Sequence, residues 1–210
     1  MPPQTLSAAD HVTIQPSVLY FGTPVVLLTT LSEDESANIS PLSSAWALGD
    51  HVVLGLSPAG QGAVNLRREG GCGGCVLNFP SADLWPKVEK IARSTGRRPV
   101  PDYKARIGYE YVADKFGLGG FTEIPSETVR PPRIAECPIQ FEARVNAMHG
   151  DGTSAHLIVE ARVTRIHAHR EIVVPGTHHI DTARWSPLFY VFRHYFGLGP
   201  DLGRNFRAEC

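Results

Sequence analysis

The chain has 210 residues, the length of one ordinary domain that can bury a hydrophobic core without disulfide or metal support. Its formal net charge of −1 gives no broad electrostatic attraction for nucleic acid or anionic lipid. No apolar run approaches the roughly 20 residues that span a bilayer, and the N-terminus lacks the basic start and apolar core of a signal peptide. We therefore expect a single cytoplasmic domain over residues 1–210, without nucleic-acid or membrane partners.

Seventeen prolines and twenty glycines favour turns and short strands over a helical bundle. Residues 1–16 are polar and contain proline, which indicates a loose lead-in with a short extended piece at His11–Ile14. The run from Pro24 to Leu31 is too continuously apolar to be half exposed, so we predict a central strand. The acidic, serine-containing residues 32–36 are typical of a solvated hairpin turn.

Residues 38–46 combine one amide, three hydroxyls and an indole within nine positions. Turn chemistry and a core tryptophan account for this composition on residue type alone. Small and hydroxyl-bearing residues between apolar runs also let a backbone come close to a flat, phosphorylated ligand. The residue types leave both interpretations open.

A Gly-rich loop at residues 57–62 follows a predicted buried strand, His51–Leu56, and precedes a predicted short helix, Ala63–Arg68. The backbone N–H groups at such a helix N-terminus, with Arg67 nearby, can bind a phosphate. An ordinary Gly-rich connector explains the same residues equally well. A phosphate site is therefore a hypothesis at this point of the chain.

Residues 70–75 read Gly-Gly-Cys-Gly-Gly-Cys, and we interpret them as a structural turn into a strand at Cys75–Asn78. A single C-x-x-C pair could be redox-active or half of a zinc site, but no second pair follows at metal-ligand spacing. The dinucleotide fingerprint G-x-G-x-x-G is also absent. Without an export signal, the four cysteines are expected to be reduced thiols.

An amphipathic helix is predicted after residue 81, with Ser81 in its cap, Leu84, Val88 and Ile91 on one face, and Gly96 as its stop. Residues 97–104 are expected to form a loop, and residues 130–134 an extended connector. Farther on, alternation predicts two strands, Ile139–Met148 and His156–Arg165, joined in a hairpin by a turn at 150–152.

His167 and His169 follow this hairpin and are expected to lie on the same side of a strand, while residues 178–179 place two further histidines after a Pro-Gly turn. A metal site would need additional converging ligands such as Glu171 or Asp181. Solvent-facing or pocket-lining histidines are the preferred interpretation, so no metal is predicted. The aromatic segment 185–199 is expected to pack on the body of the protein or on a second subunit.

The order of several short motifs resembles that of the flavin reductase family of FMN-binding split-barrel proteins. The resemblance extends from about Tyr20 to the C-terminus, and it lies in the order of the motifs rather than in any one of them. The motifs are GTPVVLLTT (22–30), ANISPLSSAW (37–46), VVLGL (52–56), NLR (65–67), VLNFPS (76–81), DKFGL (114–118), PPRIAECP (131–138) and WSPLFYVFRHYFGLG (185–199).

The resemblance implies a mainly β fold with a few helices, an antiparallel Greek-key split β-barrel with the helix after Ser81 over one opening. It also implies FMN as cofactor and NAD(P)H as electron donor. The residues implied to line the flavin are Thr29, Thr30, Asn38, Ile39, Ser40, Ser43, Ser44, Ala45 and Trp46. Those implied to hold its phosphate are Gln61, Gly62, Asn65 and Arg67. Many relatives carry several Ser or Thr residues in this loop, whereas here the backbone, Ser57 and Gln61 would replace them.

No Ser-His-Asp arrangement, H-E-x-x-H or Walker loop is present, which agrees with a reaction carried by a cofactor. The resemblance implies an NAD(P)H-dependent flavin reductase that supplies reduced flavin to a partner oxygenase or another acceptor. It further implies a homodimer, with residues 185–210 in its interface. No catalytic side chain is assigned, and the candidates for positioning the donor are Lys115, His167 and His169. Three alternatives stay open: a non-catalytic FMN electron carrier, a His-rich metal-binding barrel, and a split barrel for haem, pyridoxal phosphate or a deazaflavin.

Overall fold

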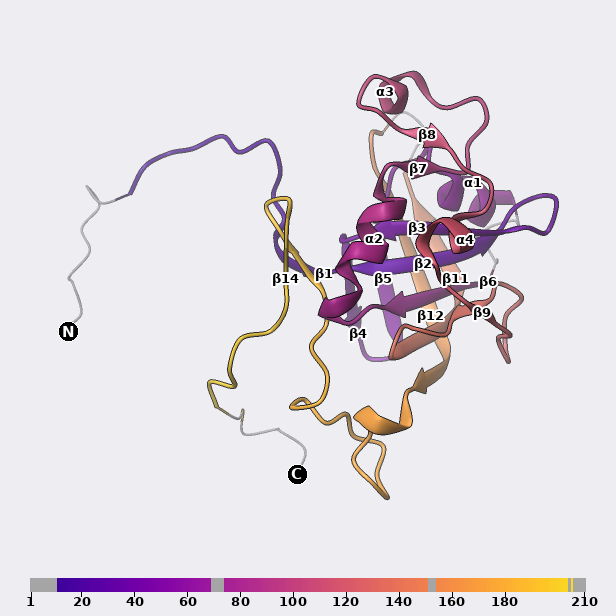
Figure 1. Ribbon diagram of the computed structural model, residues 1–210. Coiled ribbons are helices and arrows are strands. Elements are labelled where there is room, and N and C mark those ends of the chain that lie inside the picture. Colours follow the sequence, from indigo (N-terminus) through magenta and orange to yellow (C-terminus); the bar gives the residue numbers. More distant parts are fainter. Residues whose placement is uncertain (1–10, 69–73, 151–153, 204, 206–210) are drawn as a thin grey trace.

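The computed structural model describes residues 11–68, 74–150, 154–203 and 205. Its centre is a seven-stranded antiparallel sheet with the strand order β3–β2–β6–β11–β12–β5–β4 (Figure 1). The strands are β2 (Val26–Leu31), β3 (Ala37–Leu42), β4 (Ala45–Leu48), β5 (His51–Leu56), β6 (Gly74–Phe79), β11 (Ile139–His149) and β12 (Leu157–Ala168).

The two edge strands of this sheet are neighbours in the sequence. β3 ends at Leu42 and β4 begins at Ala45, so only Ser43 and Ser44 separate the two edges. So short a link spans at most about 11 Å, and the sheet must therefore curl until its edges approach each other. The predicted antiparallel split β-barrel is confirmed, with its opening along the seam between β3 and β4.

Two apolar cores lie on the two faces of the curled sheet. Val26 and Leu28 belong to the first core and Leu27 to the second, because successive side chains of a strand point to opposite faces. The first core is the barrel interior, which Leu66 from α1 (Gln61–Arg68) closes at one end. All six residues of β2 are buried, since both of its faces are covered.

Two helices cover the second core on the outside of the barrel. α2 (Trp85–Ala92) contributes Val88 and Ile91, and α4 (Lys115–Gly119) contributes Phe116. The smaller elements are the 3-10 turns η2 (Ala82–Leu84) and η3 (Arg170–Ile172), the helix α3 (Asp102–Ala105), the paired strands β7 (Ser94–Thr95) and β8 (Glu110–Tyr111), and the paired strands β9 (Glu123–Ile124) and β10 (Arg133–Ile134). None of the helices in the described ranges combines the length and apolar character that a bilayer crossing requires.

A separate three-stranded sheet joins the two ends of the described chain. β1 (Phe21–Pro24) pairs with β13 (Phe189–Val191), which pairs with β14 (His194–Phe196). Leu188 anchors this sheet in the second core, whereas the preceding N-terminal segment and the hairpin β13–β14 project from the barrel (Figure 1). The aromatic tail therefore packs partly on the barrel.

The strand predictions hold in part. β5 has the predicted bounds, and the predicted hairpin is present with longer strands that reach His149 and Ala168. The buried strand expected at Pro24–Leu31 is confirmed over Val26–Leu31, whereas Pro24 belongs to another strand, so this run serves two sheets. β1 pairs with β13, whereas β2 pairs with β3 and β6, and Val25 between them donates its N–H to Leu188 O at 2.8 Å.

The predicted helices and the loop predicted at 97–104 need corrections. α1 begins at Gln61, two residues earlier than predicted. Ser81 forms a β-bridge with Pro187 and makes no side-chain cap, and α2 ends at Ala92 rather than at Gly96 because residues 94–95 pair with β8. The loop expected at 97–104 contains the start of α3.

Some predictions lie on residues outside the described ranges. They are most of the turn at 70–75, most of the turn at 150–152, the first ten residues of the lead-in, Cys72 and Cys210. The extended piece expected at His11–Ile14 is described, and it belongs to no strand.

Candidate functional site

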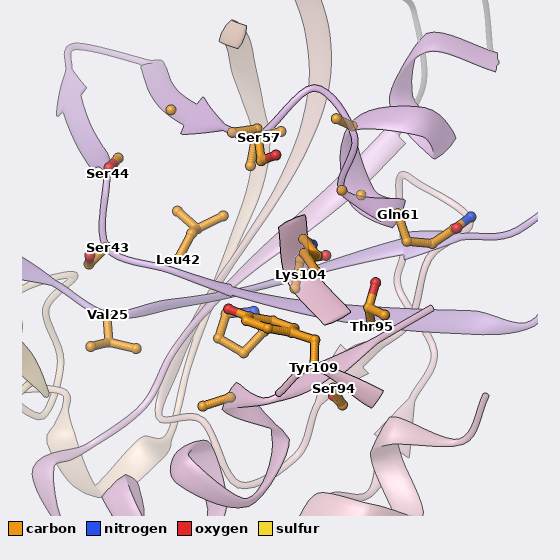
Figure 2. Close-up of a pocket in the computed structure, with 18 of the residues that line it drawn as sticks. Val25, Leu42, Ser43, Ser44, Ser57, Gln61, Ser94, Thr95, Lys104 and Tyr109 are labelled. Carbon is orange, nitrogen blue, oxygen red and sulfur yellow. The ribbon is translucent and has the colours of Figure 1, made fainter. Parts of the chain in front are cut away.

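A cavity of about 400 Å³ opens beside the seam of the barrel. Figure 2 shows Val25 and Ser43 at one end of this cavity, Gln61 and Thr95 at the other, and Lys104 and Tyr109 between them. One part of the wall comes from the β3–β4 link and from the turn that joins β5 to α1. The other part comes from α2, from β7 and the segment that follows it, and from the aromatic tail. Among the described residues that line the cavity, none is an Asp or a Glu.

Glycines allow the backbones along the seam to approach closely. The backbone N–H of Gly55 donates to Ser44 O at 2.7 Å, and a Cβ atom at Gly55 would lie 2.8 Å from Ser44 Cβ. A Cβ atom at Gly62 would lie 2.8 Å from Ser40 Oγ. Larger residues at either glycine would push the seam apart. The hydroxyl groups that share this side of the cavity are those of Ser40, Ser43, Ser44 and Ser57.

The N-terminal turn of α1 faces the cavity through Gly60, Gln61 and Gly62. The first backbone N–H groups of a helix have no partner inside the helix, and the helix dipole adds partial positive charge there. Gln61 Nε2 donates to Asn65 Oδ1 at 2.6 Å, and Asn65 Nδ2 donates to Thr30 Oγ1 at 2.9 Å. This chain of amides fixes the turn against β2, so the turn forms a rigid cradle for an anion.

Two lysines give the cavity a positive charge. Lys115 is only 3% exposed, and its Nζ donates to Ile39 O at 2.8 Å. Burial, and then the charge of Lys104, lowers the pKa of Lys115 to about 7. Burial, and then the charge of Arg97, lowers the pKa of Lys104. In the described part of the chain no carboxylate forms a salt bridge with these three cations, so an anionic ligand would relieve their mutual repulsion.

Tyrosines form the remaining wall. The rings of Tyr20 and Tyr190 lie 5.4 Å apart between centroids, and those of Tyr190 and Tyr195 lie 5.5 Å apart. Tyr195 OH donates to Glu89 Oε2 at 3.1 Å; burial, together with this neighbouring carboxylate, raises the pKa of Tyr195. Tyr109 completes the wall beneath Lys104, whose Nζ lies 5.2 Å from the ring centroid. Such a wall is suited to a flat aromatic ligand.

The residues predicted to bind flavin fall into two groups. Six predicted site residues line the cavity: Ser40, Ser43, Ser44, Gln61, Gly62 and Lys115. The other predicted flavin residues do not line it. Thr29, Thr30, Asn38, Ile39 and Asn65 are buried behind the cavity wall, and Ala45, Trp46 and Arg67 lie away from it.

The contacts of the second group explain its position. Thr29 Oγ1 donates to Pro132 O at 2.6 Å, and Asn38 Nδ2 donates to Ser40 Oγ at 3.1 Å, so both side chains support the wall from behind. Trp46 is 58% exposed on the edge strand β4. Arg67 is exposed and donates to Pro58 O at 3.1 Å, outside the cavity.

The two histidines proposed to position the donor do not line the cavity. His167 Nε2 lies 2.7 Å from Oε1 of the fully buried Glu142, and His169 Nε2 lies 2.8 Å from Ala135 O. β12 ends at Ala168, so the two rings do not share one strand face as expected. Among the described residues, no three His, Cys, Asp or Glu side chains are arranged to hold a metal ion.

Sequence reasoning missed several residues of the cavity. The sequence predicts a loop at residues 97–104 and assigns it no function. The cations in this segment were a signal for an anion site. Nothing in the local pattern, however, shows that the segment folds back over the barrel. The additional lining residues include Tyr20, Ser94, Thr95, Tyr103, Lys104, Tyr109, Tyr190 and Tyr195.

Comparison with known proteins agrees with the family resemblance seen in the sequence motifs. Residues 18–199 match the model of the flavin reductase like domain family. The uncharacterized protein YdfE of Bacillus subtilis (strain 168) is 44% identical over 197 residues, which are 93% of each chain. Among solved structures, flavoredoxin of Desulfovibrio vulgaris (Miyazaki F) has a TM-score of 0.76 at 18% identity, covering 94% of this chain and 98% of that one. Component B of nitrilotriacetate monooxygenase from Bacillus cereus has a TM-score of 0.70 at 16% identity, covering 95% and 98%.

Proposed function

Because the chain belongs to the flavin reductase like family, we propose that its cavity binds FMN and that the protein reduces this flavin with NAD(P)H. The observation that carries the proposal is the lining of the cavity, whose described residues include Lys104 and Lys115 but no carboxylate. A phosphate monoester supplies the anion that these cations lack, and charge-assisted hydrogen bonds to it are strong. The tyrosine wall and the serine hydroxyls fit the flat, polar-edged ring system of the same ligand.

The two ends of the cavity suggest how the ligand would be held. Lys104 and the first backbone N–H groups of α1 would hold the phosphate, in place of Arg67. Ser43 and Ser44 would donate to the polar edge of the ring system. These assignments rest on the lining residues and their charges.

Bound FMN supplies the redox chemistry, accepting a hydride from NAD(P)H and passing electrons on. The protein's own contribution is binding and orientation. Apolar residues such as Val25 and Leu42 limit the access of water, and Lys115 keeps a buried positive charge close to the ligand. No lining side chain is required as a nucleophile or a general acid.

The name of the similar monooxygenase component supports a partner oxygenase as the acceptor of electrons. A homodimer is supported by exposed apolar side chains on both projecting ends of the chain. Leu19 and Phe21 are 72% and 80% exposed, and Phe192 and Phe196 are 47% and 53% exposed. Apolar groups of this size gathered on projecting segments are typical of an interaction surface. Light scattering of the purified protein would give twice the chain mass for a homodimer.

Anaerobic mixing of the protein with FMN and NADH, and separately with NADPH, tests the proposed activity. The visible absorbance of the flavin should bleach much faster with protein than without it, with at least one of the two donors. Tight FMN binding with bleaching no faster than that of free flavin would instead indicate a non-catalytic electron carrier. Failure to bind FMN in a titration would contradict both functions.

A further inference from the structure

Residues 96–109 connect β7 to β8 and form one wall of the cavity; we call them the flap. The base of the flap is closed by the parallel pair β7–β8 and by two backbone hydrogen bonds. Glu110 N donates to Arg93 O, and Val112 N donates to Thr95 O, each at 3.0 Å. The tip, which contains α3, projects beyond the barrel (Figure 1). The flap is therefore tied at its base and extended at its tip.

The tip of the flap is held together by its own hydrogen bonds. Within it, Ala105 N donates to Pro101 O and Tyr109 N to Lys104 O, both at 3.0 Å. Few apolar contacts hold it to the barrel, since Ile107 is 67% exposed and Tyr103 is 47% exposed. The tip can therefore move as one body without unfolding.

One side-chain hydrogen bond joins the tip to the opposite wall of the cavity. Tyr103 OH and Ser57 Oγ lie 2.6 Å apart, and both groups are exposed. In the described ranges, it is the one hydrogen bond between the flap and the turn that precedes α1. An exposed hydrogen bond of this kind is worth little net free energy, so the flap can open readily.

The flap also carries a cation close to the helix turn that would hold the phosphate. Lys104 Nζ approaches Gly60, where a Cβ atom would lie 3.9 Å from it. Burial and the charge of Arg97 disfavour the cationic form of Lys104 when the flap is closed, as the lowered pKa reflects. An anion at the α1 turn would reverse this effect and attract the flap towards the barrel.

We propose that the flap opens to admit the flavin and closes on its phosphate, with the Tyr103–Ser57 hydrogen bond as the latch. The inference rests on the proposed function and deepens it, because it makes the bound flavin an exchanging ligand whose residence depends on its phosphate. FMN draws Lys104 and the flap closed. When riboflavin is bound, which lacks the phosphate, only the latch holds the flap closed.

Limited trypsin digestion of the flavin-free protein tests the latch independently of flavin binding. Cleavage after Lys104 and Arg106 follows the population of the open flap when opening is fast. Tyr103→Phe and Ser57→Ala should each raise the cleavage rate about threefold to tenfold, and the double variant should match the single ones. Tyr111→Phe, at the base of the flap, is the matched control and should cleave like the parent protein. Equal rates for the parent protein and both single variants would overturn the latch.

Dissociation rates of the two flavins test the closure. In stopped-flow fluorescence, Tyr103→Phe should release FMN about threefold to tenfold faster than the parent protein does. Lys104→Met should speed the release of FMN and leave that of riboflavin unchanged. Equal release of FMN and riboflavin from the parent protein would contradict closure on the phosphate. If FMN does not bind, the proposed function fails, while the digestion result still decides whether the latch exists.

Discussion

The ammonium group of Lys115 is buried without a compensating charge: the residue is 3% exposed, and no carboxylate of the described residues lies in salt-bridge range. Burial and the charge of Lys104 lower its pKa from 10.5 to about 7. The unfolded chain keeps its proton up to the higher value, whereas the folded protein releases it near the lower one. The free energy of unfolding must therefore rise with pH between these two values, the sign expected when the unfolded state binds more protons.

The size of this effect follows from the two pKa values of Lys115. Between pH 7 and pH 9, the linkage relation gives an increase of about 2 kcal/mol in the free energy of unfolding from this one group. Lys115→Met keeps a long unbranched side chain but removes the charge, so this rise should disappear. The variant should also be more stable than the parent protein at pH 7, since a buried cation no longer opposes folding.

Urea denaturation at pH 7, 8 and 9, without flavin or phosphate in the buffer, measures this difference. Groups that do not interact with Lys115 titrate equally in both proteins, so subtracting the two curves isolates Lys115 together with its coupling to Lys104. Lys90→Met, on the exposed face of α2, is the matched control and should follow the parent protein. Parallel pH profiles for the parent protein and Lys115→Met would refute the assignment of a buried, uncompensated ammonium.

Three further changes test other parts of the account. Gly55→Ala should lower the free energy of unfolding by about 1–3 kcal/mol in urea, because its Cβ would lie 2.8 Å from that of Ser44; an unchanged midpoint would show that the seam is not tightly packed. For Glu142, burial opposes ionisation but hydrogen bonds from neighbours including His167 outweigh it and lower the pKa from 4.5 to about 2. The stabilisation from ionised Glu142 is thus complete above pH 4.5 and is lost as the pH falls through 2. Glu142→Gln should therefore be less stable than the parent protein at pH 7 by about 2–3 kcal/mol, and it should lose less stability than the parent protein on acidification. Lys104→Met should weaken FMN binding about tenfold to a hundredfold in a fluorescence titration and leave riboflavin binding unchanged, and equal losses for both flavins would contradict a phosphate contact.

The individual strands were predictable from the residues because their signals are local, whereas the split barrel itself was expected from the resemblance to the flavin reductase family. Continuous apolar runs and alternation mark the strands, and β5 has the predicted bounds. Ser43 and Ser44 line the cavity because they form the short link between the two edge strands, and the cavity opens beside this seam. The break at Val25 could not be predicted, since it arises from a partner strand that lies far along the chain.

Arg67, which the resemblance implies as a phosphate ligand, does not line the cavity, and the reason is geometric. Arg67 follows Gln61 by six residues, so it lies more than one turn along α1 and on another face of it. Lys104 reaches the cavity only because β7 and β8 pair and fold the flap back, a contact that no local pattern records. The resemblance implies His167 as a candidate for positioning the donor, yet its ring is held by a carboxylate from the neighbouring strand β11.

A crystal structure of the protein grown with FMN tests the central claim most directly. The account predicts electron density for the flavin in the cavity beside the seam, with its phosphate within hydrogen-bond distance of Lys104 Nζ and the first backbone N–H groups of α1. A flavin bound elsewhere, or a phosphate held by Arg67 on the outer side of α1, would contradict it.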